Sequence, residues 1–425
     1  MEAREGVDSK RRRSTLAACA VGAALGYGTL GIAVFGQFVV PLSVKLKCNP
    51  EDLELAFSIM AVGSVLGPPV AGACIDRYGT RLVAAISAAL MGVMLFALGS
   101  AASLMQVYVL YGLVSLLGTG TLVVGYSRPI VAAFDRDRGM ALGLMLASVG
   151  AASAILPPVI ANLNERYGVG GGFTLLGGIS CGVALIVVAF IPTRGGGGRV
   201  VLAAARSRGV TASIFSRTGM TLLAISFLLG VFTSGVWSQA MPLMLAKGID
   251  SHSAATVMSY LAVVMTLTRI GAGWAMDRIF APRLGALLIL PVLLAWLIFA
   301  GASDLRTAMF AVAVLGVGVG VEFDLLSFLV SRYMVRDVYA GVYGILYSAI
   351  SLGLAASRPL VMFVEHMAGS MAVAPIVLAA ATGAATLLLL TLPSYSLGFA
   401  AERGSRDPGS GTMLANGNLV VIDGQ

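Results

Sequence analysis

Charged side chains are scarce in this chain. Asp, Glu, Lys and Arg make up only 11% of its 425 residues, whereas a typical soluble domain has about a quarter. Hydrophobic residues make up 58%, and the mean hydropathy is +0.92. So few charges cannot cover the surface of a soluble protein of this length, and so many apolar residues exclude a disordered chain. The composition therefore predicts a multi-pass membrane protein with a lipid-facing surface.

Residues that bind metals, carry redox chemistry or act as nucleophiles are also few. There are four cysteines without a CxxC pair, and His252 and His366 are the only histidines. We therefore expect no disulfide framework, no metal, no cofactor and no enzymatic centre. Glycines 316, 318 and 320 lie inside an apolar segment with no strand before them, which favours close helix packing over nucleotide binding. No basic stretch has interleaved aromatic residues, so nucleic acid is not an expected partner.

Long apolar segments and their connections predict the topology. We expect an all-α membrane protein with twelve transmembrane helices and both termini cytoplasmic, because the Arg-rich connections alternate with connections diluted by acids. The predicted segments lie near 16–44, 53–75, 82–101, 107–133, 140–164, 172–192, 218–246, 254–276, 284–302, 307–333, 340–364 and 371–393. The predicted domains are an N-terminal tail (1–13), a first six-helix bundle (14–192), a cytoplasmic linker with four glycines in a row (193–217), a second six-helix bundle (218–393) and a disordered tail (394–425).

The two predicted bundles echo each other in sequence. Asp76-Arg77 follows the second segment, and Asp277-Arg278 follows the eighth. Glycine-rich stretches recur in segments four and ten, and a glutamine shortly before Pro-Leu recurs in segments one and seven, at Gln37 and Gln239. Matched features about two hundred residues apart predict a repeat of two bundles around a midplane cavity, as in secondary transporters.

The stretch with Gly72, Asp76, Arg77, Gly79 and Arg81 resembles the loop signature of the major facilitator superfamily. Residues 126–143, 277–283, 322–333 and 343–347 are similar to the bacterial monocarboxylate transporter group, which includes oxalate–formate exchangers. The resemblance implies the major facilitator fold, transport by alternating access, and a bacterial inner membrane.

Arg269 is the principal candidate for binding substrate. An ionisable group at the middle of a span costs about 2.5–3.5 kcal/mol or more, and a guanidinium can bind a carboxylate through two parallel hydrogen bonds. The structural alternative is an arginine paired with an acid on another helix. The resemblance places Arg269 at the substrate-binding arginine of span 8. The chain has Met265, Gln37 and Ile350 where relatives carry further charged groups, so the site offers one certain cation, which favours a monoanion over oxalate.

Glu322 and Asp324 lie in the middle of the tenth segment, two residues apart, and therefore on different faces of a helix. One is expected to neutralise Arg269 across the bundle and the other to take up a proton. A helix-packing ion pair is the alternative interpretation. Arg358, beside Pro359, could add a second cation, although a structural or vestibule role is favoured.

Further candidates are polar groups in or beside the spans. Tyr126, Tyr347, Gln37 and Gln239 are expected to shape the substrate site, although tyrosines packed between helices are an equal alternative. Gating between conformations is expected from six residues: Asp76, Arg77, Arg81, Asp277, Arg278 and Arg128.

The expected function is secondary transport of small monocarboxylates such as lactate or pyruvate, coupled to protons. The expected partners are a small organic anion, protons and the lipid bilayer, with the protein acting as a monomer. Anion exchange of the oxalate–formate type, and export of other metabolites or drugs, remain alternatives.

Overall fold

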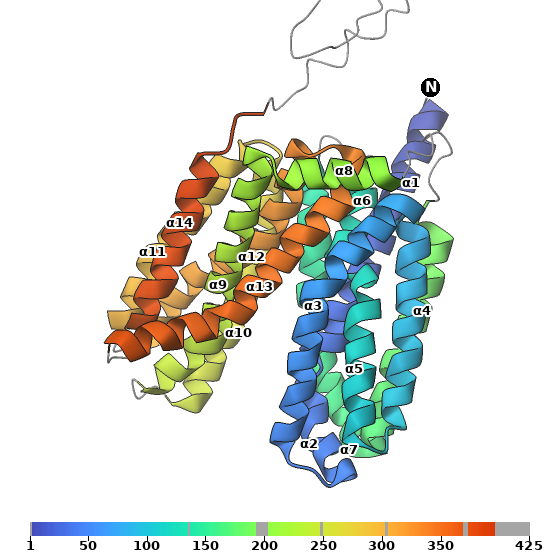
Figure 1. Cartoon of the computed structure of the whole chain (residues 1–425), viewed down its shortest axis with the longest axis vertical. Helices are drawn as coiled ribbons and strands as arrows, with labels where there is room; N and C mark the ends of the chain where they lie inside the picture. The colour runs from blue at the N-terminus through green and yellow to red at the C-terminus, as the bar shows by residue number, and fades with distance from the viewer. Residues whose placement is uncertain are drawn as a thin grey trace, which may run out of the picture. The chain divides into compact units, whose positions relative to one another are not determined.

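The computed structural model describes residues 2–134, 137–192, 203–246, 250–301, 305–368 and 373–395 (Figure 1). All regular elements in these ranges are helical, and they belong to one compact unit, Met1–Pro393. This agrees with the all-helical class predicted from the sequence.

The N-terminal half, residues 2–192, has interrupted helices. Its elements are α1 (Glu2–Ala24), the π-helix η1 (Gly28–Ala33), α2 (Gly36–Leu46), α3 (Pro50–Tyr78), α4 (Thr80–Gly99), α5 (Leu104–Gly118), the 3-10 helix η2 (Thr119–Thr121), α6 (Val123–Ala133) and α7 (Arg138–Phe190). The first predicted segment is thus divided into α1, η1 and α2, and the fourth into α5, η2 and α6. Such breaks in membrane helices often mark functional positions.

The C-terminal half, residues 203–395, has longer uninterrupted helices. Its elements are α8 (Ala203–Ile214), α9 (Arg217–Ala246), α10 (Ser251–Met276), α11 (Ala281–Gly301), α12 (Leu305–Tyr333), the 3-10 helix η3 (Arg336–Val338), α13 (Tyr339–Ala368) and α14 (Ala374–Leu390). No break comparable to η1 or η2 interrupts α9 or α12, the counterparts of the first and fourth spans.

Within the described residues, ten helices are long and apolar enough to cross a membrane. One of them, the 53-residue α7, covers two predicted segments, and its path changes at Gly168, where φ is +68°. Another predicted segment corresponds to α14, which is apolar but has only 17 residues. The count of twelve spans and the location of the termini stay predictions.

The predicted tail and linker contain helix. Residues 2–13 form the start of α1, and part of the predicted linker forms α8. Gly195–Gly198 and the chain after Tyr395 lie outside the described residues.

Each half has its own apolar core. Phe38, Tyr111 and Phe173 are buried in the first, where the rings of Phe38 and Phe173 stack with centroids 3.9 Å apart. Trp296 and Phe299 are buried in the second. Because each half buries its own side chains, the polar groups between the halves can rearrange without opening either core.

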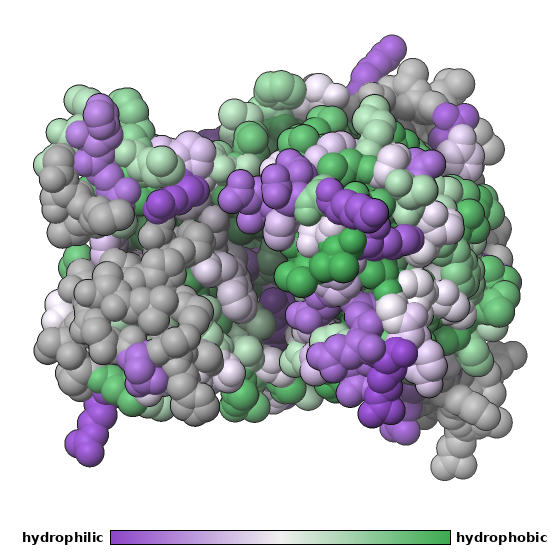
Figure 2. Space-filling model, turned by 90° about the horizontal axis from the view of Figure 1, so that it is seen from below, coloured by the Kyte–Doolittle hydropathy of each residue, from purple (hydrophilic) through white to green (hydrophobic). Residues whose placement is uncertain are grey.

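The halves meet along two helix pairs, α3 with α13 and α7 with α10. Close approach needs glycine: a Cβ atom at Gly72 would overlap the carbonyl of Ala340, and one at Gly139 would overlap that of Gly273. Seen from the end opposite to α8, the surface is hollowed near its middle, with hydrophilic residues deep in the hollow (Figure 2).

Candidate substrate site and gate

Arg269 of α10 lies where this helix passes α7. The residue is 7% exposed. One terminal nitrogen donates a long hydrogen bond of 3.5 Å to the carbonyl of Leu146, and Nε has no hydrogen-bond partner within the described residues. A guanidinium carries five N–H donors. Arg269 is thus a buried cation whose hydrogen-bonding capacity is largely unused in this part of the chain.

Asp324 of α12 is the acid beside Arg269. The closest approach, from Oδ2 to a terminal nitrogen of Arg269, is 4.0 Å. Neither Asp324 side-chain oxygen has a hydrogen-bond partner in the described structure, although the residue is fully buried. The two side chains attract each other electrostatically, but the gap leaves room for a competing group.

Glu322, on another face of α12, contacts α9. Its Oε2 accepts a hydrogen bond from the hydroxyl of Thr233, and its Oε1 has no described hydrogen-bond partner. The residue is fully buried. The structure therefore brings Arg269, Asp324 and Glu322 into one region while giving the two acids different partners.

Tyr347 of α13 belongs to the same region. It is half-buried and lies within electrostatic range of Glu322 and Arg269. Its ring packs against Phe323, with centroids 5.4 Å apart. It also touches the apolar core of the N-terminal half. Tyr347 therefore connects the charged cluster to the other half.

The other predicted site residues lie elsewhere or outside the description. Tyr126 is fully buried, and its ring packs on Gly22 of α1 inside the N-terminal half. Gln37 is half-buried on α2, and its carbonyl accepts from the side chain of Asn164. Gln239 lies in α9, but its side chain is outside the described residues.

The break in the first span is held by hydroxyl groups. The backbone N–H of Tyr27, just before η1, donates to the hydroxyl of Thr121 in η2, so the two breaks of the N-terminal half touch. The Tyr27 hydroxyl lies 2.9 Å from that of Ser64, and the Thr29 hydroxyl 3.3 Å from that of Ser153. All of these groups are neutral.

Asp76, near the end of α3, reaches across to the first turn of α13. Its carboxylate accepts from the backbone N–H groups of Ala340 at 3.2 Å and Gly341 at 2.7 Å. Arg128 Nε lies 3.6 Å from the same carboxylate. Arg128 also donates to the carbonyl of Ile75 at 2.7 Å. A carboxylate at a helix N-terminus is favoured by the free N–H groups and the helix dipole. We call this set the Asp76 contact.

Asp277, at the end of α10, makes the matching contact with the first turn of α7. It accepts from the backbone N–H groups of Gly139 at 2.7 Å and Met140 at 2.9 Å. Burial raises the pKa of this carboxyl, and the two N–H groups partly oppose that shift. Beside this Asp277 contact, Arg138 donates to the carbonyl and hydroxyl of Ser331 on α12, both at 3.3 Å.

The remaining candidate gating residues lie at the same end of the bundles but not between the backbones. Arg77 is exposed and lies over the ring of Tyr78. Arg278 is exposed, lies 4.1 Å from the Trp274 ring and donates to the Trp274 carbonyl. Arg81 is half-buried and lines a pocket described below.

Several residues at these contacts are absent from the sequence prediction. Thr233 has no distinguishing signal, because hydroxyl residues are frequent in the spans. Tyr27 stands between two glycines, which hints at a local break. The backbone N–H groups that meet Asp76 and Asp277 carry no side-chain signature, although Gly139 and Gly341 each occur near the start of a span.

A family model agrees with this architecture. Residues 16–357 match the model of the Major Facilitator Superfamily. The chain belongs to this superfamily. It is therefore a multi-pass integral membrane protein of a transporter family, and the family predicted from the sequence is confirmed.

Relatives within the superfamily include monocarboxylate transporters. Mouse Monocarboxylate transporter 11 is 26% identical over 81% of this chain and 76% of that protein. Bovine Monocarboxylate transporter 13 is 26% identical over 88% of this chain and 87% of that protein. An uncharacterized MFS-type transporter of Escherichia coli, YhjX, is 23% identical over 73% and 79%.

Solved structures share the fold. The E. coli fucose:proton symporter FucP superposes with a TM-score of 0.73 at 13% identity, covering 90% of this chain and 98% of the other. The human organic anion transporter MFSD10 gives a TM-score of 0.71 at 14% identity, covering 89% and 99%. The fold is therefore that of major facilitator transporters.

Proposed function

We propose that this protein carries small monocarboxylates across the membrane by alternating access, together with protons. The observation that carries the proposal is Arg269, a buried cation with spare hydrogen-bond donors and only a loose ion pair. A buried cation in such a state is costly, and a carboxylate with two oxygens would satisfy it. The names of the monocarboxylate transporter relatives agree with this substrate class.

A single negative charge suits the site better than two. Arg269 is the cation of the cluster, and the resemblance to oxalate exchangers puts Ile350 where those carriers have a second cation. Arg358, the other candidate, is exposed on α13. A dicarboxylate would bury one carboxylate without a cation, which is strongly unfavourable.

Charge balance supports proton coupling. A monocarboxylate that binds Arg269 competes with Asp324, which then loses its cation while it remains buried. Keeping that carboxyl ionised would be costly, so it gains a proton as the substrate enters. One anion and one proton then leave the total charge of the site unchanged. Glu322, held by Thr233, is the second group able to carry a proton.

Alternating access is supported by the two ends of the molecule. The Asp76 and Asp277 contacts join the halves at one end, while the surface is hollowed at the opposite end (Figure 2). We assign twelve spans, with α7 contributing two and α14 the last. The Arg-rich connections support a cytoplasmic location for both termini and for the closed end.

The test is uptake of radiolabelled lactate into proteoliposomes with an inward proton gradient. Arg269→Ala should lower uptake about a hundredfold, because a charge-assisted hydrogen-bond pair contributes about 3 kcal/mol. Arg306→Ala, at an exposed position of α12, is the matched control and should retain native uptake. Native uptake in Arg269→Ala would remove this residue from the site. Failure of the native protein to carry any acid in a panel with pyruvate, acetate and aromatic acids would overturn the substrate class.

Coupling is tested separately with Asp324→Asn and Glu322→Gln. The variant at the coupling residue should still exchange internal for external lactate, but a proton gradient should no longer drive accumulation. If both variants accumulate lactate as the native protein does, proton coupling through these acids is wrong. If the native protein exchanges lactate but ignores the gradient, the protein is an anion exchanger.

A further inference from the structure

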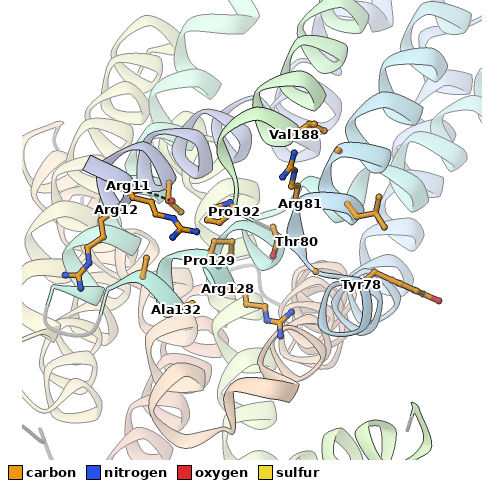
Figure 3. A pocket seen from close by; sticks show the side chains of 15 residues that line it. Arg11, Arg12, Tyr78, Thr80, Arg81, Arg128, Pro129, Ala132, Val188 and Pro192 are labelled. Atoms are coloured by element: carbon orange, nitrogen blue, oxygen red, sulfur yellow. Dashed lines mark hydrogen bonds between the residues drawn. The ribbon is translucent and has the colours of Figure 1, made fainter. Parts of the chain in front are cut away.

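A polar pocket lies outside the cluster of Arg269, Asp324 and Glu322. It has a volume of about 870 Å³ and lies at the end of the N-terminal half that carries the Asp76 contact (Figure 3). Five helices contribute to it: α1, the end of α3, α4, α6 and the last turn of α7. The residues that line it are Arg11, Arg12, Thr15, Tyr78, Gly79, Thr80, Arg81, Leu82, Ala85, Arg128, Pro129, Ala132, Ala133, Val188 and Pro192.

The charge of this pocket has one sign. Four of its lining residues are arginines, and none of the lining residues is acidic. In Figure 3 the side chains of Arg11 and Arg81 extend toward the pocket from α1 and α4, on either side of Pro192. Arg128 instead reaches toward Asp76. In Figure 3 the side chain of Arg12 extends away from Pro192, so Arg11 and Arg81 are the pair that faces the pocket.

The backbone adds to the positive potential. Thr80 and Arg81 begin α4, whose first turn contains no acid and whose preceding residue, Gly79, provides no side-chain cap. The first N–H groups of a helix lack intrahelical acceptors. They complement the two guanidinium groups, which are well suited to phosphate because they present paired donors.

Much of the rest of the wall is apolar, and part of it is exposed on the outer surface of the helices. Leu82 is 52% exposed and Val188 is 43% exposed, and they flank the pocket on α4 and α7. Ala85, Ala132 and Ala133 continue this wall. A small hydrophilic ion would leave this surface uncovered, whereas an amphiphile would place its charged group on the arginines and its chains along the wall.

We propose that the pocket binds the phosphate group of an anionic membrane lipid. Arg11 and Arg81 bind the phosphate oxygens, and the apolar wall beside Leu82 and Val188 receives the start of the acyl chains. The same phosphate chemistry occurs in soluble phosphate esters, so the experiment includes one of each. A zwitterionic headgroup is disfavoured because its cation meets four arginines.

The pocket is connected to the Asp76 contact through Arg128. This residue lines the pocket and also lies 3.6 Å from Asp76. A phosphate in the pocket adds negative charge near Arg128 and so competes with Asp76 for it. This second step rests on the gating part of the proposed function, whereas binding of the lipid does not.

The binding test is native mass spectrometry of the detergent-purified full chain with phosphatidylglycerol, phosphatidylcholine or glycerol 1-phosphate. The native protein should retain phosphatidylglycerol, and Arg11→Gln with Arg81→Gln should reduce the bound fraction roughly tenfold. Arg11→Lys with Arg81→Lys should give an intermediate loss, because charge is kept while the paired donors are lost. Arg283→Gln is the matched control: Arg283 follows Asp277 as Arg81 follows Asp76, it is exposed, and it does not line the pocket.

Equal retention of phosphatidylglycerol by the double glutamine variant would overturn the site. Retention of phosphatidylcholine equal to that of phosphatidylglycerol would overturn its preference for anions. Binding of glycerol 1-phosphate that phosphatidylglycerol does not displace would overturn the assignment to a lipid. Melting curves of each variant identify any that has lost its fold, and the lysine pair then decides the outcome.

The link to gating is measured by lactate exchange in vesicles of phosphatidylcholine with and without phosphatidylglycerol. A change of exchange rate with phosphatidylglycerol in the native protein, absent in the double glutamine variant, supports the link. An unchanged rate together with confirmed lipid binding overturns the link alone. If lactate is not carried at all while lipid still binds, the substrate proposal fails and the lipid site stands.

Discussion

The two halves of this transporter share the order of their helices but differ in chemistry at their centres. The C-terminal half keeps Arg269, Glu322 and Asp324 buried between helices without breaks comparable to η1 and η2. In the N-terminal half, the first and fourth spans are interrupted, and the groups that meet there are the neutral hydroxyls of Tyr27, Ser64 and Thr121. Long continuous helices can hold costly charges at fixed distances, whereas a broken span can change shape. We infer that one half binds charge and the other adapts around the substrate.

The two contacts that join the halves, at Asp76 and at Asp277, also differ from each other. Both Asp76 and Asp277 accept two backbone N–H groups from a helix of the opposite half. Asp76 is fully buried and also pairs with Arg128, whereas Asp277 is half-buried. The two contacts are related by the repeat but are not equally strong, so one should yield before the other.

The largest effect is expected from unbalancing the charged cluster. Arg269→Ala should destabilise the protein by about 3–5 kcal/mol, because it leaves buried acid without its cation. Adding Asp324→Asn should recover about half of that loss, while transport stays absent. Unfolding in detergent micelles followed by circular dichroism measures both. No recovery in the double variant would show that Asp324 does not depend on Arg269.

The Asp76 and Asp277 contacts, the proposed gate, should respond unequally to removal of charge. Asp76→Asn leaves the partly buried Arg128 without its carboxylate and should cost about 2 kcal/mol or more of the closed state. Asp277→Asn removes a charge that burial disfavours in the closed state but turns one of the two acceptor oxygens into a donor, so it should cost at most about 1 kcal/mol. Spin labels at the exposed residues Tyr78 and Ile279, in a cysteine-free background, report the distance between the halves. If the two variants broaden the distribution of distances between the labels equally, the ranking of the two contacts is wrong.

Acidification should stabilise the closed state through Asp277. Burial raises the pKa of Asp277 in the closed state, with the charge of Asp137 adding to the rise and that of Arg332 opposing it. The closed state therefore binds a proton more readily than an open state in which the carboxyl is solvated. Its extra stability is fully present below the ordinary carboxyl pKa of about 3.9. That stability is lost as the pH rises through the higher closed-state value.

The same spin labels test this prediction. The closed population should grow on acidification in the native protein, and that growth should be smaller in Asp277→Asn. An identical pH response in both proteins would exclude Asp277 as the titrating group.

The smallest effect is expected in the neutral half. Tyr27→Phe removes a hydroxyl that lies 2.9 Å from Ser64 and should change the KM for lactate about two- to fivefold, since a neutral hydrogen bond contributes about 1 kcal/mol. Tyr108→Phe is the control, because it also removes a tyrosine hydroxyl but lies at a half-buried position near the start of α5, where the hydroxyl donates to the carbonyl of Asp52. If Tyr27→Phe lowers lactate uptake as much as Arg269→Ala does, the proposed difference between the halves is wrong.

The sequence was sufficient for the helical class, the superfamily and the buried ionisable residues, because long apolar segments and isolated charges are local signals. It left open which acid faces Arg269, since Glu322 and Asp324 lie on different faces and only the rotation of α12 against α10 places Asp324 there. It ranked Tyr126 and Tyr347 together, yet Tyr126 packs inside one half and Tyr347 lies beside the charged cluster. The partners of Asp76 and Asp277 are backbone N–H groups. Nearly every residue has one, so the sequence could not predict which residues would meet these carboxylates.

The glycines between the halves have a consequence for the electrical insulation of the membrane. At Gly72 and Gly139 the opposing backbones approach so closely that no side chain fits between them, and a water molecule at the position of the missing Cβ atom would overlap the same carbonyl oxygen. A file of water molecules would conduct protons independently of any substrate and would discharge the gradient that the carrier is proposed to use. Backbone contact interrupts such a file without placing an ionisable side chain on its path. Gly72→Ser should force the backbones apart. Proteoliposomes with this variant should then acidify under an inward proton gradient even when no transported acid is present.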